Sequence, residues 1–341
     1  MGKLKRFEGI KEGIENTNYS IETEKGRYIL TIYEKRVKET DLPFFSNLMF
    51  ELSKNGFMCP KPISNKDNNY ISNLNNKKFM IVSFLDGKSK SSLSPSESKI
   101  VGNQIAKLHK IAQKFKLERK NDLSIKSWRS IFSQVKDKCN RIHVDLPKLI
   151  EANLISIEKE WPKNLPAGII HADLFSDNIF FKNNKFSGFI DFYFSCNDFY
   201  AFEIAICFNA LCFDGVKQNL SFNVTKPKKL MEGYNEVRKI SKDEKIAIKV
   251  LSQGAALRFL LTRVFDYINT VDDAFVKIKD PEEYLKRLEF HKNAKSFEDK
   301  SFNFFHNSLF LTGFFDAVFH PFFSHLFIQV VIPSFTYVES V

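Results

Sequence analysis

The expected fold follows from one short stretch, His171-Ala172-Asp173-Leu174-Phe175-Ser176-Asp177-Asn178. Downstream of it, two apolar runs, 179–181 and 186–190, flank the turn signal Asn183-Asn184, a pattern typical of a β-hairpin. A hairpin returns the chain to its starting point, so Asp191, which follows the second run, is expected beside Asn178. The sequence therefore predicts a loop and a hairpin that bring several polar residues to one place.

These polar residues form a candidate centre for phosphoryl transfer. The carboxylate of Asp191 and the amide oxygen of Asn178 would face one spot, and Mg²⁺ prefers oxygen ligands of this kind. Asp173 projects from the same loop and can accept a proton from a substrate hydroxyl. The order His-x-Asp-x-x-x-x-Asn, with Asp-Phe further on, matches the catalytic loop of kinases, in which positioning and charge neutralisation supply most of the catalysis. The pattern therefore predicts kinase-like chemistry, with Asp173 as the catalytic base and Asn178 and Asp191 as ligands of Mg²⁺.

The rest of the chain predicts strands around one helix, followed by a mainly helical region. Apolar and alternating runs predict strands at 19–23, 27–34 and 79–85, and helical spacing predicts a helix at 43–54. Ser94-Pro95-Ser96-Glu97 and Ser241-Lys242-Asp243-Glu244 are capping boxes, and the helices that they start are expected to reach about residues 114 and 269. The expected fold class is α+β, with an antiparallel sheet in a small first lobe and helices in a larger second lobe.

We expect three parts along the chain: an ATP-binding lobe at 1–87, a catalytic and substrate-binding lobe at 88–293, and an apolar tail at 294–341. Residues 301–341 hold 11 of the 37 phenylalanines and no Lys or Arg. Prolines interrupt the uncharged run at 317–338, which favours a peripheral or core-packing appendage over a membrane-spanning helix. A tail from an altered reading frame at the end of the gene is a third interpretation, and the role of the tail stays open.

Composition and charge limit the classes of function. A chain of 341 residues with 43% hydrophobic and 27% charged residues can bury a sizeable core, so a wholly disordered protein is excluded. The net charge of +11 raises a nucleic-acid hypothesis, but the lysines are dispersed and no RNA- or DNA-binding motif is visible. The five cysteines include no Cys-x-x-Cys pair, which argues against a disulfide framework and a zinc site. Because the N-terminus has no apolar signal segment, we expect a cytoplasmic protein.

Motifs in both expected lobes resemble one kinase family. The catalytic stretch with Asp191 looks like that of the aminoglycoside-phosphotransferase/choline-kinase superfamily, whose fold is the two-lobed protein-kinase-like one. Further segments are similar to type II homoserine kinases: Gly13-Ile14-Glu15-Asn16-Thr17-Asn18-Tyr19, Tyr28-Ile29-Leu30-Thr31-Ile32-Tyr33-Glu34, Phe192-Tyr193-Phe194-Ser195-Cys196-Asn197-Asp198, Gly254-Ala255-Ala256-Leu257-Arg258-Phe259-Leu260-Leu261-Thr262-Arg263 and Lys279-Asp280-Pro281-Glu282-Glu283-Tyr284-Leu285. The resemblance covers roughly residues 5–293. It implies ATP-dependent phosphorylation of the hydroxyl of L-homoserine to O-phospho-L-homoserine, a step of threonine biosynthesis.

The resemblance also implies which residues meet ATP. These are Gly13, Asn16 and Asn18 in the loop that covers the phosphates, Thr31 on the third strand, and Ser83 and Leu85 in the adenine pocket and hinge. Thr31 is a departure, because wider members of the superfamily place a Lys or Arg there to grip the phosphates. Lys35 or Arg36 could reach the phosphates instead.

Substrate contacts follow from the groups that homoserine carries. A site for its ammonium and carboxylate should bring an acid and an arginine near the catalytic base, because Arg presents a planar fork that matches a carboxylate. Asn197 and Asp198 could contact the ammonium, and Arg258 or Arg263 could meet the carboxylate. The two arginines project about 140° apart on a helix, so we favour Arg258. We expect Glu203 to anchor the catalytic loop.

Three alternatives remain open at this point. The same chemistry could serve another small alcohol, such as choline, an amino sugar or an aminoglycoside, and an acidic pocket in the second lobe would favour these cations. Thr31 motivates a second alternative, a catalytically impaired kinase-like binding module. A nucleic-acid binder is the third and rests on the net charge alone. We expect a small-molecule substrate and no nucleic acid. A membrane contact is not expected, but the apolar tail leaves it open, and the oligomeric state is open as well.

Overall fold

The computed structural model describes residues 1–10, 16–34, 37–215, 219–270 and 279–294. The chain divides into two compact units, Met1–Lys300 and Ser301–Val341. The expected apolar tail lies outside the described residues, apart from its first residue. In the part of the chain that is described, no helix is both long enough and apolar enough to cross a membrane.

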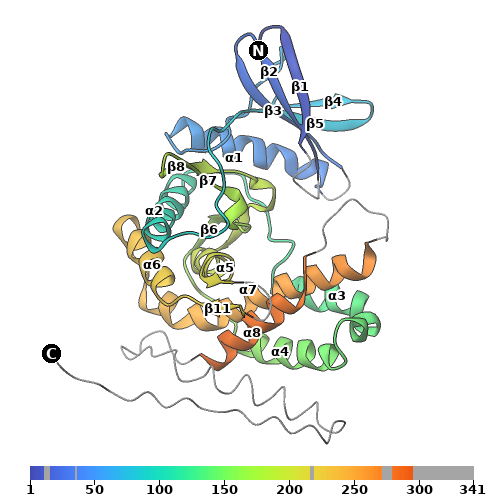
Figure 1. Cartoon of the computed structure of the whole chain (residues 1–341), viewed down its shortest axis with the longest axis vertical. Helices are drawn as coiled ribbons and strands as arrows, with labels where there is room; N and C mark the ends of the chain where they lie inside the picture. Colours follow the sequence, from blue (N-terminus) through green and yellow to red (C-terminus); the bar gives the residue numbers. More distant parts are fainter. Residues whose placement is uncertain (11–15, 35–36, 216–218, 271–278, 295–341) are drawn as a thin grey trace, which may run out of the picture. The chain divides into compact units, whose positions relative to one another are not determined.

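An antiparallel sheet of five strands, in the order β1-β2-β3-β5-β4, forms the N-terminal part of the first unit (Figure 1). Its strands are β1 (Leu4–Ile10), β2 (Thr17–Thr23), β3 (Gly26–Ile32), β4 (Ile71–Leu74) and β5 (Lys77–Ser83). The short helix η1 (Glu39–Asp41) precedes α1 (Leu42–Lys54), which buries Phe45, Leu48 and Leu52 at helical spacing. The expected hairpin, helix and third strand are confirmed, whereas β1 and β4 were not predicted.

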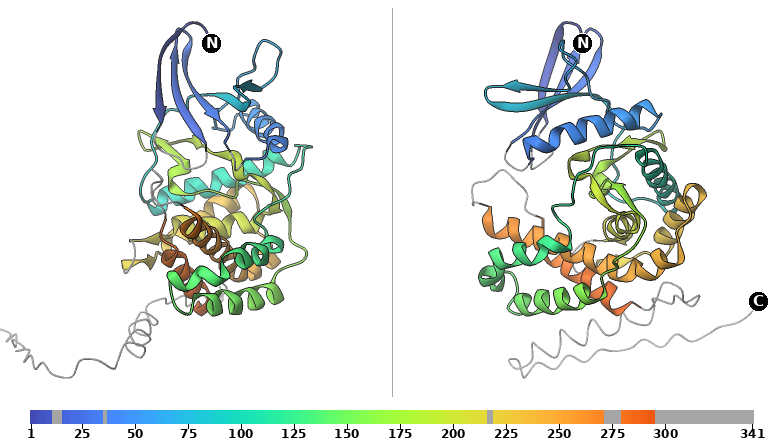
Figure 2. Two further views of the ribbon diagram at one scale, coloured as in Figure 1. Left: turned by 90° about the vertical axis from the view of Figure 1, so that its right-hand side faces the viewer. Right: turned by 180° about the vertical axis from the view of Figure 1, so that it is seen from behind.

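The remainder of the first unit is mainly helical (Figure 2). Its helices are α2 (Pro95–Ala112), α3 (Ile125–Val135), η2 (Lys136–Arg141), α4 (Leu146–Glu160), η3 (Ser176–Asn178), η4 (Phe192–Phe194), α5 (Tyr200–Leu211), α6 (Thr225–Val237), α7 (Lys242–Asn269) and α8 (Glu282–Asn293). Three short antiparallel pairs lie among them: β6 (Ala167–Ile170) with β9 (Cys196–Phe199), β7 (Ile179–Lys182) with β8 (Lys185–Phe189), and β10 (Phe213–Asp214) with β11 (Ser221–Phe222). The α+β prediction is confirmed.

Both predicted capping boxes start helices. The Ser94 hydroxyl accepts from the backbone N–H of Glu97, whose carboxylate accepts from the backbone N–H of Ser94. Ser241 and Glu244 repeat the arrangement at the start of α7. Each box satisfies two N–H groups that a helix N-terminus would otherwise leave without partners.

Helices α2 and α6 cross at two glycines. A Cβ atom on Gly102 would meet the carbonyl oxygen of Leu230, and a Cβ atom on Gly233 would meet that of Lys99. The two backbones therefore approach more closely than larger residues would permit, which brings α6 tightly against α2.

The linker between the sheet and α2 is bonded to the hairpin β7–β8. Lys88 and Phe181 exchange both of their backbone N–H···O hydrogen bonds, each 2.9 Å long. The Ser187 hydroxyl on β8 donates to the carbonyl oxygen of Asp86. Hydrogen bonds thus join the linker to the hairpin, and they help to position Asp191, which follows β8.

Candidate active site

The stretch 171–178 forms a loop between β6 and β7, and its conformation is unusual at one residue. Ala172 has a φ of 66°, in the left-handed region that few non-glycine residues adopt. Its backbone is held from both sides: the Glu203 carboxylate of α5 accepts from the N–H groups of His171 and Ala172, and Arg258 Nη1 of α7 donates to the Ala172 carbonyl oxygen at 2.6 Å. Glu203 therefore anchors the loop, as expected.

His171 joins this loop to the end of β8. Its Nε2 atom donates to the carbonyl oxygen of Ile190 at 2.9 Å, and its Nδ1 atom accepts from the backbone N–H of Asp173 at 3.3 Å. Burial lowers the pKa of His171, which favours the neutral ring that these two hydrogen bonds require. The backbone N–H of Ile190 in turn donates to the Asn178 carbonyl oxygen at 3.0 Å. Asp191 is therefore adjacent in the chain to a residue bonded to Asn178.

The side chains of Asn178 and Asp191 suit a hard cation that prefers oxygen ligands. Asn178 Nδ2 donates to the carbonyl oxygen of Asp173 at 2.8 Å and lies 3.3 Å from its Oδ2 atom. This bond fixes the orientation of the amide, so that its oxygen points away from Asp173. Asp191 is exposed and has a φ of 62°, a second left-handed residue at this place. An amide oxygen and a carboxylate are hard ligands that suit Mg²⁺, which usually takes few protein ligands and completes its shell with water and substrate phosphates.

The Asp173 carboxylate is half-buried and electrostatically perturbed. Burial raises its pKa to about 7, with a further increase from Asp191, while the Arg258 and Lys279 cations lower it. A carboxylate with a pKa near neutrality is suited to take a proton from a hydroxyl. The arrangement thus contains a base and an adjacent pair of oxygen ligands.

Of the predicted ATP contacts on the sheet side, Asn18 lies on β2, Thr31 lies on β3 and Asn16 lies just before β2. Thr31 is buried on β3, and its hydroxyl donates to the side-chain oxygen of Asn18 on β2 at 2.8 Å. The Asn16 side-chain oxygen accepts from the backbone N–H of Glu34. Gly13, Lys35 and Arg36 lie outside the described residues.

Ser83 and Leu85, the predicted adenine contacts, lie at the end of β5 and just beyond it. The Ser83 hydroxyl accepts from the backbone N–H of Lys61 at 2.9 Å. Leu85 lies against Gly188 of β8, where a Cβ atom would meet both the Leu85 side chain and the carbonyl oxygen of Met58. Ser83 therefore belongs to the sheet and Leu85 lies against the catalytic hairpin, and the contact of both residues with ATP stays a prediction.

Asn197 and Asp198 on β9 are engaged with the connection between α2 and α3. The Asn197 side-chain oxygen accepts from the backbone N–H of Arg119 at 2.9 Å. Asp198 accepts from the Asn121 side chain and from the backbone N–H of Phe199. Burial raises the pKa of Asp198. Their predicted contact with a substrate ammonium is untested by this geometry.

Arg258 and Arg263 project in different directions from α7, in agreement with their spacing. Arg258 is 2% exposed and bonded to the catalytic loop. Arg263 donates to the Asp280 carbonyl oxygen and to the Glu283 carboxylate, in the segment before and at the start of α8. Only Arg258 lies at the catalytic loop, and its bond to a backbone oxygen there was not foreseen.

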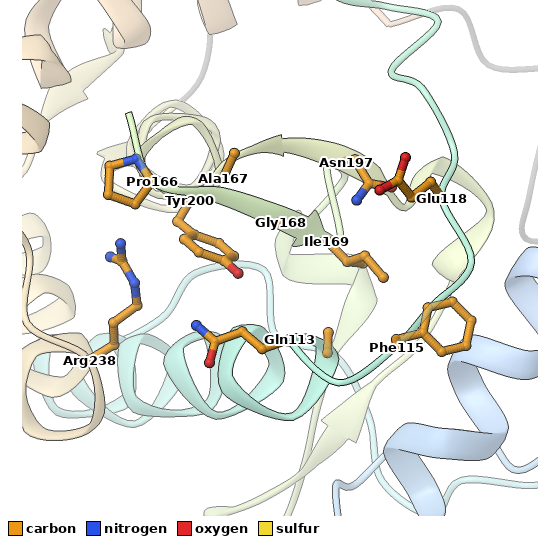
Figure 3. A pocket seen from close by; sticks show the side chains of 11 residues that line it. Gln113, Phe115, Glu118, Pro166, Ala167, Gly168, Ile169, Asn197, Tyr200 and Arg238 are labelled. Carbon is orange, nitrogen blue, oxygen red and sulfur yellow. The ribbon is translucent and has the colours of Figure 1, made fainter. Parts of the chain in front are cut away.

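A cavity of about 420 Å³ lies behind the catalytic loop, between β6, β9 and the C-terminal end of α2. Figure 3 shows Arg238 and Glu118 at opposite ends of it, with Tyr200 and Gln113 between them. None of its lining residues is Asp173, Asn178 or Asp191. The cavity is therefore separate from the candidate catalytic groups.

One feature of the site had no signal in the sequence. Left-handed backbone is common for Gly, Asn and Asp, so an alanine such as Ala172 gives no indication of it. Glu203 was expected to anchor the loop, but Arg258, which holds the Ala172 carbonyl, lies 86 residues away along the chain, a separation that local patterns do not register.

Comparisons with known proteins agree with this geometry. Residues 6–220 match a family described as the phosphotransferase enzyme family. The chain is 43% identical to a homoserine kinase of Mesorhizobium japonicum over 87% of its length and 92% of the relative, and 44% identical to one of Parvibaculum lavamentivorans over 87% and 91%. The solved structure of an amicoumacin kinase in complex with AMP-PNP and Ca²⁺ superposes with a TM-score of 0.63 at 12% identity, covering 84% of this chain and 86% of that one. This likeness confirms the expected kinase-like fold.

Proposed function

The chain belongs to the phosphotransferase enzyme family, and we propose that it phosphorylates the hydroxyl of L-homoserine with ATP to give O-phospho-L-homoserine. The observation that carries the proposal is the loop at 171–178, which places a carboxylate of raised pKa next to an oriented amide oxygen. The identity to homoserine kinases over most of the chain supports the choice of substrate.

Asp173 is the proposed base. In its ionised form it accepts the proton of the substrate hydroxyl as that oxygen attacks the terminal phosphorus of ATP. Its position is set by the neighbouring backbone: Glu203 holds the two preceding N–H groups, and Arg258 holds the Ala172 carbonyl. Arg258 also lowers the pKa of Asp173, which keeps more of the carboxylate ionised at neutral pH.

Asn178 and Asp191 are the proposed ligands of Mg²⁺. The hydrogen bonds from Asn178 Nδ2 to Asp173 turn the Asn178 side-chain oxygen away from Asp173. The backbone hydrogen bond from Ile190 to Asn178 keeps Asp191, the next residue, close to Asn178. A bound Mg²⁺ would neutralise charge on the phosphates of ATP. Residues 1–87 are the proposed ATP-binding lobe and 88–293 the proposed catalytic and substrate-binding lobe.

Coupled measurement of ADP release tests the proposal. The wild-type chain is expected to turn over L-homoserine with a higher kcat/KM than choline, an amino sugar or an aminoglycoside. Preferential turnover of one of those three would contradict the choice of substrate, and no turnover of any would contradict kinase activity.

A metal titration tests the proposed ligands. Asp191→Asn is expected to raise the Mg²⁺ concentration for half-maximal rate at least about tenfold, because an amide replaces a charged ligand. Asp145→Asn, an exposed aspartate beside α4, is the matched control and should leave the titration unchanged. An unaltered Mg²⁺ requirement in Asp191→Asn would remove that residue from the metal site.

A further inference from the structure

We infer that Asp177 and Lys279 together form the subsite for the amino-acid head group of the substrate. Lys279 would bind the carboxylate and Asp177 the ammonium. This inference rests on the proposed function and names residues that neither the sequence analysis nor the comparisons assign to substrate.

The substrate sets the requirement. Homoserine carries its ammonium and carboxylate on one carbon, and two methylene groups separate that carbon from the hydroxyl to be phosphorylated. A matching site needs an anion and a cation a few ångströms apart, both accessible and both close to the catalytic base.

Lys279 and Asp177 meet the distance and accessibility requirements. The Lys279 Nζ atom lies 3.9 Å from Asp177 Oδ2, and the two side chains are 50% and 65% exposed. At this separation the pair is a weak, solvent-screened contact, so a zwitterion can replace it with two charge-assisted hydrogen bonds at little cost.

The pair also lies beside the proposed base. Asp177 belongs to the same loop as Asp173, and Lys279 Nζ lies 5.0 Å from the ring centre of Phe175, between the two aspartates in the chain. The Lys279 cation lowers the pKa of the Asp173 carboxyl and the Asp177 carboxylate raises it, so both charges lie close enough to act on Asp173. A head group held by the pair therefore has its hydroxyl in the neighbourhood of Asp173.

Arg263 holds the backbone and the first turn of α8 just after Lys279. Arg263 Nη1 donates to the carbonyl oxygen of Asp280 at 2.8 Å and to the Glu283 carboxylate at 2.9 Å. Its guanidinium also lies over the Tyr284 ring, 4.4 Å from the ring centre. This role explains an arginine in α7 that does not reach the catalytic loop.

The two arginines favoured by the sequence are less suited to the carboxylate. Arg258 is 2% exposed and donates to the Ala172 carbonyl oxygen, so a ligand would have to displace a bond that shapes the loop. The Arg263 side chain is 11% exposed and already paired with Glu283. Lys279 is the more accessible cation, and a lysine at the edge of a site binds a carboxylate as a point charge.

Steady-state kinetics with three alcohols tests the assignment. The alcohols are L-homoserine, 3-amino-1-propanol, which lacks the carboxylate, and 4-hydroxybutyrate, which lacks the ammonium. Lys279→Met keeps an unbranched apolar side chain and removes the ammonium that lies over the Phe175 ring. It is expected to raise KM for homoserine and 4-hydroxybutyrate about 10- to 100-fold and to leave KM for 3-amino-1-propanol unchanged. Asp177→Asn should show the converse: KM should rise for homoserine and 3-amino-1-propanol and stay unchanged for 4-hydroxybutyrate. Where the wild type does not turn over an analogue, its inhibition constant against homoserine replaces KM.

The exposed pair Lys148 and Asp145, whose charged atoms lie 3.7 Å apart beside α4, supplies matched controls. Lys148→Met and Asp145→Asn should leave all three alcohols unaffected, and KM for ATP should be unchanged in every variant. The inference would be overturned if Lys279→Met or Asp177→Asn raised KM equally for all three alcohols. A change confined to KM for ATP, or no change in any KM, would overturn it as well. Absence of homoserine turnover by the wild type would instead remove the proposed function, and the inference with it.

Discussion

The two sides of the candidate active site hold their polar groups in different ways. On the catalytic-loop side, Glu203 and Arg258 fix the backbone at Ala172, and His171 ties the loop to Ile190. On the sheet side, Thr31 stands where the resemblance expects a basic residue, and its hydroxyl makes a neutral hydrogen bond to Asn18.

This difference indicates where catalysis is concentrated. Glu203 on α5 and Arg258 on α7 hold Ala172 in a left-handed conformation that an alanine rarely adopts. The described part of β3 supplies no cation at Thr31 for the phosphates, so charge neutralisation would fall more heavily on the Mg²⁺ that Asn178 and Asp191 are proposed to hold. Substitutions on the loop side should therefore lower activity far more than those at Thr31.

The largest effect is expected for Asp173→Asn. Loss of the proposed base should lower kcat about 10²- to 10⁴-fold, measured as ADP release. The same change should stabilise the fold: burial raises the pKa of Asp173 from 3.8 to about 7, so the ionised carboxylate destabilises the native state above pH 4. We expect a gain of about 1–3 kcal/mol in the free energy of unfolding at pH 8 that disappears below pH 4. Retained kcat would contradict the role of Asp173.

A smaller loss is expected for Glu203→Gln. Glutamine is a neutral, weaker acceptor, and it puts an NH₂ donor in place of one of the two carboxylate oxygens that accept from His171 and Ala172. The loop should therefore lose its fixed geometry, and kcat should fall about 10- to 100-fold. The buried Glu244 is the matched control, since it pairs with Arg238 away from the loop. Glu244→Gln should lower the melting temperature but preserve kcat of the folded enzyme; equal kcat losses in both variants would show a general packing effect.

Arg258→Gln should shift the pH dependence of the reaction. The Arg258 cation lowers the pKa of Asp173, so its removal raises that pKa, and the ionised base is then lost at a higher pH on acidification. The acid limb of the kcat/KM profile should move upward by about one pH unit. Arg129→Gln, at an exposed arginine that pairs with Glu158 away from the loop, should leave this limb in place. If the acid limb of the kcat/KM profile stayed in place in Arg258→Gln, the ionisation of Asp173 would not control that limb.

The smallest effect is expected for Thr31→Val, which is isosteric and removes the hydroxyl that donates to Asn18. The loss of one neutral hydrogen bond should cost about 1 kcal/mol of stability in denaturant unfolding. KM for ATP should change less than about threefold, because no charge is lost. A large loss of activity would show that the sheet side contributes as much as the loop side and would remove the contrast between them.

Much of the fold could be predicted because its signals are local. The capping boxes at Ser94 and Ser241 and the hairpin after Asn178 each depend on residues within a few positions of one another. Strand β1 has no such signal: its residues are almost all exposed, so the alternation of apolar and polar side chains that marks a half-buried strand is missing.

The candidate site could be predicted only in part. Asp173, Asn178 and Asp191 were identifiable because they lie on one loop and one hairpin. The contacts of Arg258 and Arg263 depend on how α7 packs against distant segments, so their side chains could be placed on a helix but not given partners. The same limit hid the proximity of Lys279 to Asp177, which depends on how the segment before α8 lies against the loop.

The glycine crossing of α2 and α6 has a consequence for the interpretation of genetic variants. Any side chain at Gly102 or Gly233 would push apart two backbones, so such alleles should lower the amount of folded protein in cells. In a growth-based screen they would look as damaging as changes at Asp173, although neither glycine belongs to the candidate site. Measuring abundance alongside growth would separate the two classes, since only the crossing alleles would deplete the protein.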